Sequence, residues 1–146
     1  ITEHKARMSA IAFSPDGAWL ATGGHDWKIL LWNTKTWALA RTLEGHTQGI
    51  YGLKFSEDGR RLLSSGSDSA TILWDMETFR EVLQIEGWVS DIRPGSMDIV
   101  TGTRDIGVFL WPAFPWDPDT YAGDPDLPLS RRVEAYKEQF WQARRP

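Results

Sequence analysis

Three side chains in the middle of the chain have the types that hydrolases use for nucleophilic catalysis. They are an acid, a base and a hydroxyl: Asp68, His46 and Ser64. Such a triad also needs an exposed nucleophile and donors for an oxyanion. The chain has no Gly-x-Ser-x-Gly turn that would present a serine, and the same residue types recur 42 positions earlier. We therefore predict a repeated structural unit, no catalytic residue and no enzyme activity.

Metal and phosphate chemistry have little support in the sequence. The three histidines are His4, His25 and His46, and none lies at ligand spacing from another histidine or a cysteine. The glycines at Gly23-Gly24 and Gly66 precede neither a helix pattern nor a Gly-Lys-Ser/Thr sequence, so we interpret them as turn residues. The sequence predicts no metal site and no cofactor.

Composition narrows the class of protein further. The chain has 146 residues, of which 41% are hydrophobic and 25% charged, which is typical of a globular domain. A net charge of −4 gives no electrostatic basis for binding nucleic acid. No apolar run approaches the roughly 20 residues of a membrane span. The absence of cysteine excludes disulfides and fits a cytoplasmic location. We expect neither nucleic acid nor a membrane as a partner.

The elements that carry these residues are predicted from the repeat itself. Residues 50–75 align on residues 8–33 without a gap, and each copy contains an Asp-Gly turn between alternating apolar positions. A strand-rich repeat of this length is typical of propeller blades. The pattern predicts strands near residues 10–14, 19–23, 28–33 and 37–43, and again near 52–56, 61–65, 70–75 and 80–85.

A third unit is shorter. Residues 99–111 align on residues 20–32, but Pro112 and Pro115 follow at once, and proline cannot donate to a strand ladder. We therefore expect this unit to lack its outer strand. Residues 112–128 are predicted to form a Pro/Asp-rich linker. Residues 129–144 are predicted to form an amphipathic helix, which would either bind a partner or pack on this protein's own sheets.

Residues 1–111 resemble the WD-repeat family. The first two units each have His, then Phe-Ser-x-Asp-Gly nine residues later, then Ser or Thr, Asp, and Trp six residues after that Asp. The Gly-His pair is complete at Gly45-His46 and the Trp-Asp pair at Trp74-Asp75. The resemblance implies an all-β fold, a partial β-propeller of about three four-stranded antiparallel blades at residues 4–45, 46–86 and 87–111.

The resemblance also implies a buried hydrogen-bonded set in each blade, which we call a tetrad. The matching positions are His4, Thr22, Asp26 and Trp32 in the first unit, and His46, Ser64, Asp68 and Trp74 in the second. In the third unit Thr101, Asp105 and Trp111 remain, but Trp88 stands in place of the histidine.

In this family, partners usually bind the face formed by the turns between second and third strands and by the loops entering first strands. The positions that map to this face are Arg7, Ser9, His25, Tyr51, Ser67 and Arg104. Trp27 and Trp116, in turn or loop context, either contact a partner or pack internally. The expected function is a non-catalytic scaffold that binds a protein or peptide.

The repeat alignment also leads to predictions about the parts of a propeller that this sequence does not contain. Ile1 aligns with Leu43 at a strand end, so we interpret the chain as the C-terminal three blades of a longer propeller. The remaining blades would come from a longer chain or from an oligomer. The bare edge at residues 108–111 would then receive a strand from upstream. The alternative function is an accessory propeller region of a longer enzyme or signalling protein.

Overall fold

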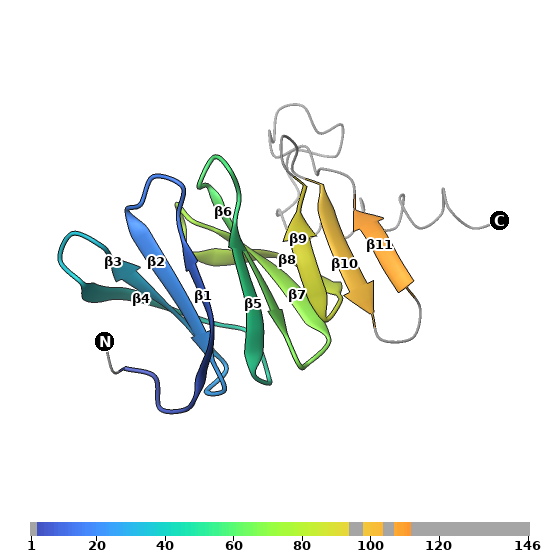
Figure 1. Cartoon of the computed structure of the whole chain (residues 1–146), viewed down its shortest axis with the longest axis horizontal. Helices are drawn as coiled ribbons and strands as arrows, with labels where there is room; N and C mark the ends of the chain where they lie inside the picture. The colour runs from blue at the N-terminus through green and yellow to red at the C-terminus, as the bar shows by residue number, and fades with distance from the viewer. Residues whose placement is uncertain (1–2, 94–97, 104–106, 112–146) are drawn as a thin grey trace, which may run out of the picture. The chain divides into compact units, whose positions relative to one another are not determined.

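Three antiparallel sheets follow one another along the chain (Figure 1). The computed structural model describes residues 3–93, 98–103 and 107–111, and all of its elements are strands. The predicted all-β class and the pattern of four, four and three strands are confirmed. The predicted linker and helix at residues 112–128 and 129–144 lie outside the described residues, as do Asp105, Arg104 and Trp116.

Each sheet is a meander whose strands pair in chain order, and we call the three sheets blades 1, 2 and 3. Blade 1 contains β1 (Met8–Phe13), β2 (Trp19–Gly24), β3 (Lys28–Asn33) and β4 (Ala38–Glu44). Blade 2 contains β5 (Ile50–Phe55), β6 (Arg61–Gly66), β7 (Ala70–Asp75) and β8 (Arg80–Glu86). Blade 3 contains β9 (Val89–Ile92), β10 (Ile99–Thr103) and β11 (Gly107–Trp111).

The observed strands differ from the predicted ones at two kinds of boundary. β1 and β5 begin two residues earlier than predicted, because a shift in register near their starts allows Met8 and Ile50 to pair with the far ends of β2 and β6. The fourth strand of blade 1 begins at Ala38 rather than Trp37. Trp37 instead ends the preceding turn, with a φ of 55°.

The Asp-Gly turns predicted from sequence have a clear local cause. Gly17 adopts a φ of 69°, which glycine reaches without the steric cost of a Cβ atom. The Oδ1 atom of Asp16 accepts hydrogen bonds from the Ser14 hydroxyl at 2.6 Å and the Ala18 amide at 2.9 Å. These bonds, that from Ser14 above all, hold the pKa of Asp16 below its ordinary value. The equivalent turn in blade 2 has the same geometry around Asp58.

The main core lies between blades 1 and 2, where β1 runs beside β5 (Figure 1). Ile29 and Leu31 of blade 1 and Ile50, Leu62 and Ile72 of blade 2 are completely buried. The sheets approach so closely at one point that a Cβ atom added to Gly23 would meet Ile50 Cγ2 at 2.7 Å. This contact ties the start of β5 to the second strand of the neighbouring blade.

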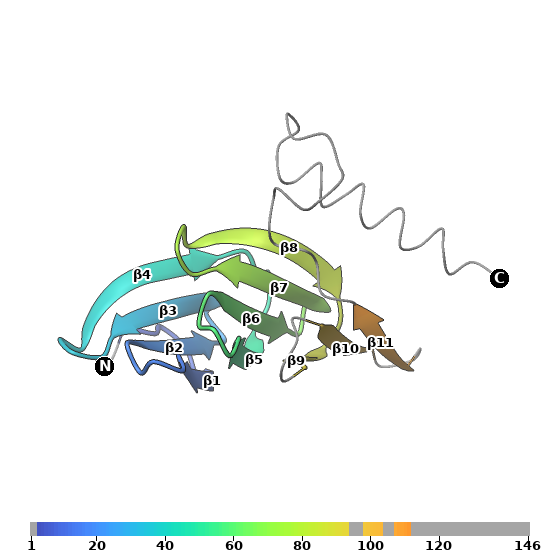
Figure 2. The same ribbon diagram turned by 90° about the horizontal axis from the view of Figure 1, so that it is seen from above.

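Blade 3 follows blade 2, with β9 near β5 and β6 (Figure 2). Across this second junction, Lys54 Nζ lies 3.4 Å from an Asp91 carboxylate oxygen. β11 pairs with β10, and within the described residues no further strand pairs with its other edge. Val108 and Leu110 on β11 are exposed apolar side chains. None of the described residues forms a helix that could cross a membrane.

Candidate partner-binding face and the tetrads beneath it

Blade 2 contains a chain of four hydrogen-bonded side chains that connects a turn to the core. The Nδ1 atom of His46 lies 2.9 and 3.1 Å from the two carboxylate oxygens of Asp68. On the other side of the ring, His46 Nε2 lies 2.8 Å from the Ser64 hydroxyl oxygen. That oxygen also accepts a hydrogen bond from Trp74 Nε1 at 2.8 Å. Four residues from two strands and two connections are thereby joined.

Blade 1 repeats this arrangement with threonine in place of serine. His4 Nδ1 lies 3.0 Å from both carboxylate oxygens of Asp26. His4 Nε2 lies 2.9 Å from Thr22 Oγ1, which accepts a hydrogen bond from Trp32 Nε1 at 3.0 Å. The tetrad is less deeply buried than that of blade 2, because 9% of the His4 side chain is exposed and none of the His46 side chain.

The acceptor at the turn fixes the direction of these bonds. A carboxylate can only accept, so the His Nδ1 atoms donate to Asp26 and Asp68. Burial would raise the pKa of Asp68, but hydrogen bonds from the Thr47 amide and from His46 outweigh it and hold the pKa below its ordinary value of 3.8. The pKa of Asp26 is lowered in the same way, against its own burial, by His4 and the Lys5 amide. Both carboxyl groups are ionised at neutral pH.

Within the described residues, the third blade retains only the last hydrogen bond of the tetrad, from tryptophan to a hydroxyl. Trp111 Nε1 donates to Thr101 Oγ1 at 2.9 Å, as the tryptophans of blades 1 and 2 do to their hydroxyls. Trp88, which replaces the histidine, donates its Nε1 hydrogen to Ser69 Oγ in blade 2. An indole nitrogen is a donor only and cannot relay between an acid and a hydroxyl. Trp88 therefore contacts the neighbouring blade instead.

The tetrads have the composition of a catalytic triad but a different accessibility. Ser64 is fully buried, and its hydroxyl is bonded to both His46 and Trp74. A nucleophile requires an exposed hydroxyl, which Ser64 does not have. Among the described residues, no group of three His, Cys, Asp or Glu side chains is arranged to hold a metal ion. The geometry instead ties the β2–β3 and β6–β7 turns to the loops that enter β1 and β5.

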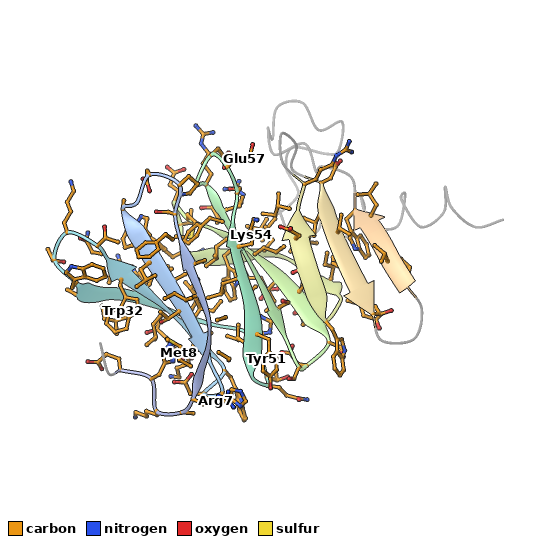
Figure 3. All side chains as sticks on the ribbon, viewed as in Figure 1. Arg7, Met8, Trp32, Tyr51, Lys54 and Glu57 are labelled. Atoms are coloured by element: carbon orange, nitrogen blue, oxygen red, sulfur yellow. The ribbon has the colours of Figure 1, made fainter. Side chains whose placement is uncertain are left out.

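The turns that the tetrads hold present the predicted partner-binding residues at one end of blades 1 and 2. His25 precedes the tetrad acid Asp26, and its amide donates to the Arg7 carbonyl at 2.8 Å. The amide of Ser67 donates to the Gly49 carbonyl in the same way in blade 2. Figure 3 shows Arg7, Met8 and Tyr51 at this end of the sheets, with Lys54 and Glu57 towards the other.

An aromatic pair joins the two blades at this end. The His25 ring stands edge-on to the Tyr51 ring, with centroids 5.3 Å apart and planes at 86°. The same His25 ring lies against Gly49, where an added Cβ atom would be 3.5 Å from its Cγ. Ser9 fixes the backbone beside them, because its hydroxyl donates to the Ile50 carbonyl at 2.5 Å. Tyr51 is packed on one side yet 54% exposed.

We call the surface formed by Arg7, Ser9, His25, Tyr51 and Ser67 the His25–Tyr51 face. The structure brings these five predicted residues together, and the sixth, Arg104, lies outside the described residues. Arg7, His25 and Tyr51 are exposed, whereas Ser9 and Ser67 are half-buried. Their roles in binding stay predictions.

Two exposed apolar side chains near this face were not included in the predicted set. Trp27 follows the tetrad acid with a φ of 68° and is exposed at the β2–β3 turn. Met8 is exposed at the start of β1, although its equivalent Ile50 is completely buried. Its turn context had already identified Trp27 in the sequence as a residue that either contacts a partner or packs internally. No signal existed for Met8, because its exposure depends on which sheet lies beside it.

Comparison with known proteins places these features in a family. The family described as "WD domain, G-beta repeat" matches residues 1–33 and 37–75. These two segments contain both complete tetrads. The third unit lies outside the matched residues, in keeping with its loss of the histidine and of the Asp-Gly turn.

The matches to curated relatives each cover about one third of this chain. The "Periodic tryptophan protein 2 homolog" of Caenorhabditis elegans is 35% identical over 51 residues, which are 35% of this chain and 6% of the relative. The "Nuclear distribution protein PAC1-1" of Uncinocarpus reesii is 38% identical over 50 residues, or 34% of this chain and 11% of the relative. The "General transcriptional corepressor TUP1" of Saccharomyces cerevisiae is 41% identical over 46 residues, or 32% and 6%. The matches thus span a small part of each relative.

Proposed function

Since the chain belongs to the WD-repeat family through residues 1–33 and 37–75, we propose that it is a non-catalytic scaffold that binds a protein or peptide on the His25–Tyr51 face. WD repeats generally mediate interactions between proteins. The blades in this proposal are residues 4–45, 46–86 and 87–111. The tetrads have a structural role in it, and the chain works in the cytoplasm without a cofactor.

The observation that carries the proposal is the edge-on pair of His25 and Tyr51. Tyrosine contributes large contact area with few rotatable bonds, so it loses little conformational entropy when a partner binds. The His25 ring, which itself lies against Gly49, already packs on one side of the Tyr51 ring, and this contact reduces that loss further. The exposed guanidinium of Arg7 adds the cation that interface centres favour beside aromatic residues.

The electrostatics of the chain favour a protein partner over a polyanion. The net charge is −4. Several described lysine and arginine side chains are paired with carboxylates, so they do not form the basic stripe that a polyanion would bind. A peptide that carries a hydrogen-bond acceptor for Arg7 and an apolar side chain for Tyr51 would match the groups that the face offers.

Site-specific photo-crosslinking tests this function. A benzoylphenylalanine at position 51 should capture a cellular protein that the same residue at position 35, on the exposed β3–β4 turn, does not capture. With the captured protein purified, Tyr51→Ala should weaken binding by about tenfold or more, as truncation of an interface anchor does. Lys35→Ala is the matched surface control and should leave binding unchanged. Equal capture at both positions would contradict the proposal.

A second candidate function is supported by the lengths of the relatives. The matched stretches cover only 6% to 11% of the three relatives named above. These blades would then be an accessory region of a longer enzyme or signalling protein. The reading frame that contains this sequence distinguishes the two, since a catalytic domain in the same frame favours the accessory role.

A further inference from the structure

One exposed hydroxyl of the described residues has an acidic sequence around it. The exposed serine and threonine side chains there are Thr36, Thr42, Thr47 and Thr78. Only Thr78 among them has an acid three positions later, which is Glu81, and Glu77 precedes it directly. Ser65 has an acid at the same spacing, but Ser65 is buried. Acidic residues around a hydroxyl are the charge pattern that acid-directed protein kinases select in their substrates.

Thr78 lies in the β7–β8 turn, which the Asp75 carboxylate organises. Asp75 Oδ1 accepts hydrogen bonds from the Thr78 hydroxyl at 3.0 Å and from the Thr78 and Glu77 amides at 2.7 and 2.9 Å. The other carboxylate oxygen lies 2.6 Å from Arg61 Nη1. Burial would raise the pKa of Asp75, but the bonds from Thr78 and the charge of Arg61 outweigh it and hold the pKa below 3.8. The Thr78 hydroxyl therefore contacts a carboxylate that is ionised at neutral pH.

The position of this turn gives a kinase access to it. Within the described residues, β8 pairs with β7 and with no strand on its other side. The side chains of Thr78 and Glu81 are both exposed. A hairpin at the edge of a sheet opens locally at a lower cost than its central strands do. The turn can therefore open towards a kinase while β5 and β6 stay paired.

The residue that follows Thr78 connects the turn to blade 1. The Phe79 ring stands edge-on to Trp19 of blade 1, with centroids 5.7 Å apart and planes at 73°. The guanidinium carbon of Arg41, also in blade 1, lies 5.3 Å from the centroid of the same ring. Both geometries are favourable, the first for an aromatic pair and the second for a cation over a ring. The Phe79 amide donates to the Asp75 carbonyl at 2.8 Å, so the placement of this ring depends on the same turn.

We propose that Thr78 is a phosphorylation site for an acid-directed kinase, and that its phosphate opens the β7–β8 turn and weakens the junction between blades 1 and 2. In the reaction, Thr78 Oγ1 forms a bond to the γ-phosphorus of ATP, and the bond from that phosphorus to its bridging oxygen breaks. ADP leaves, and the hydroxyl proton passes to a base of the kinase. The site lies at the opposite end of blade 2 from the His25–Tyr51 face, so the inference goes beyond the proposed function.

The phosphorylated turn contains a repulsion that the unmodified turn lacks. The ester oxygen of Thr78 has no hydrogen to donate, and the phosphate places a charge of about −1.5 to −2 beside the Asp75 carboxylate. A phosphate next to an acidic side chain disrupts structure by like-charge repulsion. Arg61 already contacts Asp75, so it neutralises the phosphate only by leaving that carboxylate. The turn therefore releases Thr78, and the Phe79 ring moves with it.

Blade 1 contains a matched turn without these features. Asn33 Oδ1 accepts hydrogen bonds from the Thr36 hydroxyl at 3.4 Å and the Thr36 amide at 3.2 Å, but the amide side chain of Asn33 has no charge. Leu39 stands at the position that corresponds to Glu81. Thr36 is thus equally exposed in an equivalent turn. It lacks both the acid that a kinase would select and the carboxylate that a phosphate would repel, so it is an internal control.

Incubation of the full chain with ATP, Mg²⁺ and an acid-directed casein kinase tests the site. Mass spectrometry of the product should find phosphate on Thr78 and none on Thr36. Glu81→Gln should lower the initial rate by about tenfold or more, because it removes the selected charge. Glu86→Gln, near the far end of β8, is the matched control and should leave the rate unchanged. Absence of phosphate from Thr78, equal phosphate on Thr36, or an unchanged rate with Glu81→Gln would overturn the site.

Urea denaturation tests the opening of the turn. Treatment with the kinase should lower the urea midpoint by about 0.5–1 M, and the control Thr78→Val should not respond to it. Thr78→Glu should also lower the midpoint, whereas Thr36→Glu should change it by less than about 0.2 M. Asp75→Asn gives the turn the uncharged acceptor of blade 1, so in that background Thr78→Glu should lose about half as much or less. A higher midpoint after phosphorylation, or equal losses at the two threonines, would contradict the opening.

The effect on the junction is tested in a Trp19→Leu background, which removes the ring that Phe79 contacts in blade 1. If the added charge acts through that contact, Thr78→Glu should lower the urea midpoint less in this background than in the parent chain. Additive losses would overturn the transmission to blade 1. None of these results depends on the crosslink at position 51, so the two proposals can fail separately.

Discussion

Blades 1 and 2 share a sequence pattern and a meander topology, yet equivalent side chains on the two sheets differ in solvent exposure. Phe13 and Phe55 are related by the 42-residue repeat, and 57% of Phe13 is exposed against 6% of Phe55. Met8 and Ile50 differ in the same direction. The cause is position, because blade 1 packs on the Phe55 side of blade 2, whereas none of the described sheets packs on the Phe13 side of blade 1. Local sequence therefore determines the sheet, and the neighbouring sheet determines how much each side chain is buried and how much it contributes to stability.

The largest expected effect concerns that phenylalanine pair. Phe55→Ala should lower the free energy of unfolding by about 3–5 kcal/mol, the usual cost of removing a buried aromatic side chain. Phe13→Ala should change it by no more than about 0.5 kcal/mol, because the ring is already exposed. Urea denaturation of both variants measures the difference. Equal losses would mean that the side of blade 1 on which Phe13 lies is covered in solution.

A smaller difference is expected between the two tetrads. His46→Ala leaves Asp68 and Ser64 without a partner in a fully buried site, and we expect a loss of about 2–3 kcal/mol. His4→Ala should cost about 1–2 kcal/mol, because water can reach the site and replace part of the lost bonds. Thermal and urea denaturation of the two variants give the ranking. A costlier His4 would show that the blade 1 tetrad is better shielded than the structure indicates.

Blades 1 and 2 should both lose stability at low pH through their tetrad aspartates. The pKa values of Asp26 and Asp68 are both lowered in the folded protein, from an ordinary value of 3.8. Their contribution to stability is therefore complete above the pKa of the unfolded chain, and it is lost as the pH falls below 3.8 through the lower folded value. Asp26→Asn and Asp68→Asn should each flatten the fall in stability below pH 4, which urea denaturation at a series of pH values measures.

The smallest effect is expected outside both tetrads. His25→Ala removes an exposed ring from the β2–β3 turn and should change the free energy of unfolding by no more than about 0.5 kcal/mol. The contrast with His46→Ala tests the repeat register. If urea titration shows that His25 is the costlier histidine, the alignment of the two blades is wrong.

The sequence was sufficient for features that depend on residues within one repeat. The spacing from His46 to Trp74 recurs in the first unit, and such a recurrence predicts that the four tetrad side chains occupy equivalent places. The Asp-Gly turn and the limit of three strands in blade 3 within the described residues were predictable for the same reason, because turn chemistry and proline act on the local backbone.

Features that depend on two repeats were not predictable. Phe79 lies sixty residues from Trp19, and nothing in either stretch indicates that their rings meet. The conformation of Trp37 was also missed, since an aromatic residue after a turn ordinarily favours the start of a strand. The short strand β9 has no counterpart motif because blade 3 lost its Asp-Gly turn. Tertiary packing decides the contact between Phe79 and Trp19, whereas the hydrogen bonds of the Asn33 turn set the conformation of Trp37.

The graded sizes of side chains between blades 1 and 2 have a consequence for ring geometry. The face of blade 1 at this junction has Ala10, Ala21 and Gly23 on its first two strands and Ile29, Leu31 and Leu43 on its last two. Small side chains on one side and large ones on the other give this face of blade 1 the shape of a wedge, and Ile50 of blade 2 packs where the side chains are small. The angle of that wedge, repeated at every junction, sets how many blades complete a circle, a number that ranges from about four to eight in propellers. Gly23→Ala would open the narrow side and so favour a ring with more members.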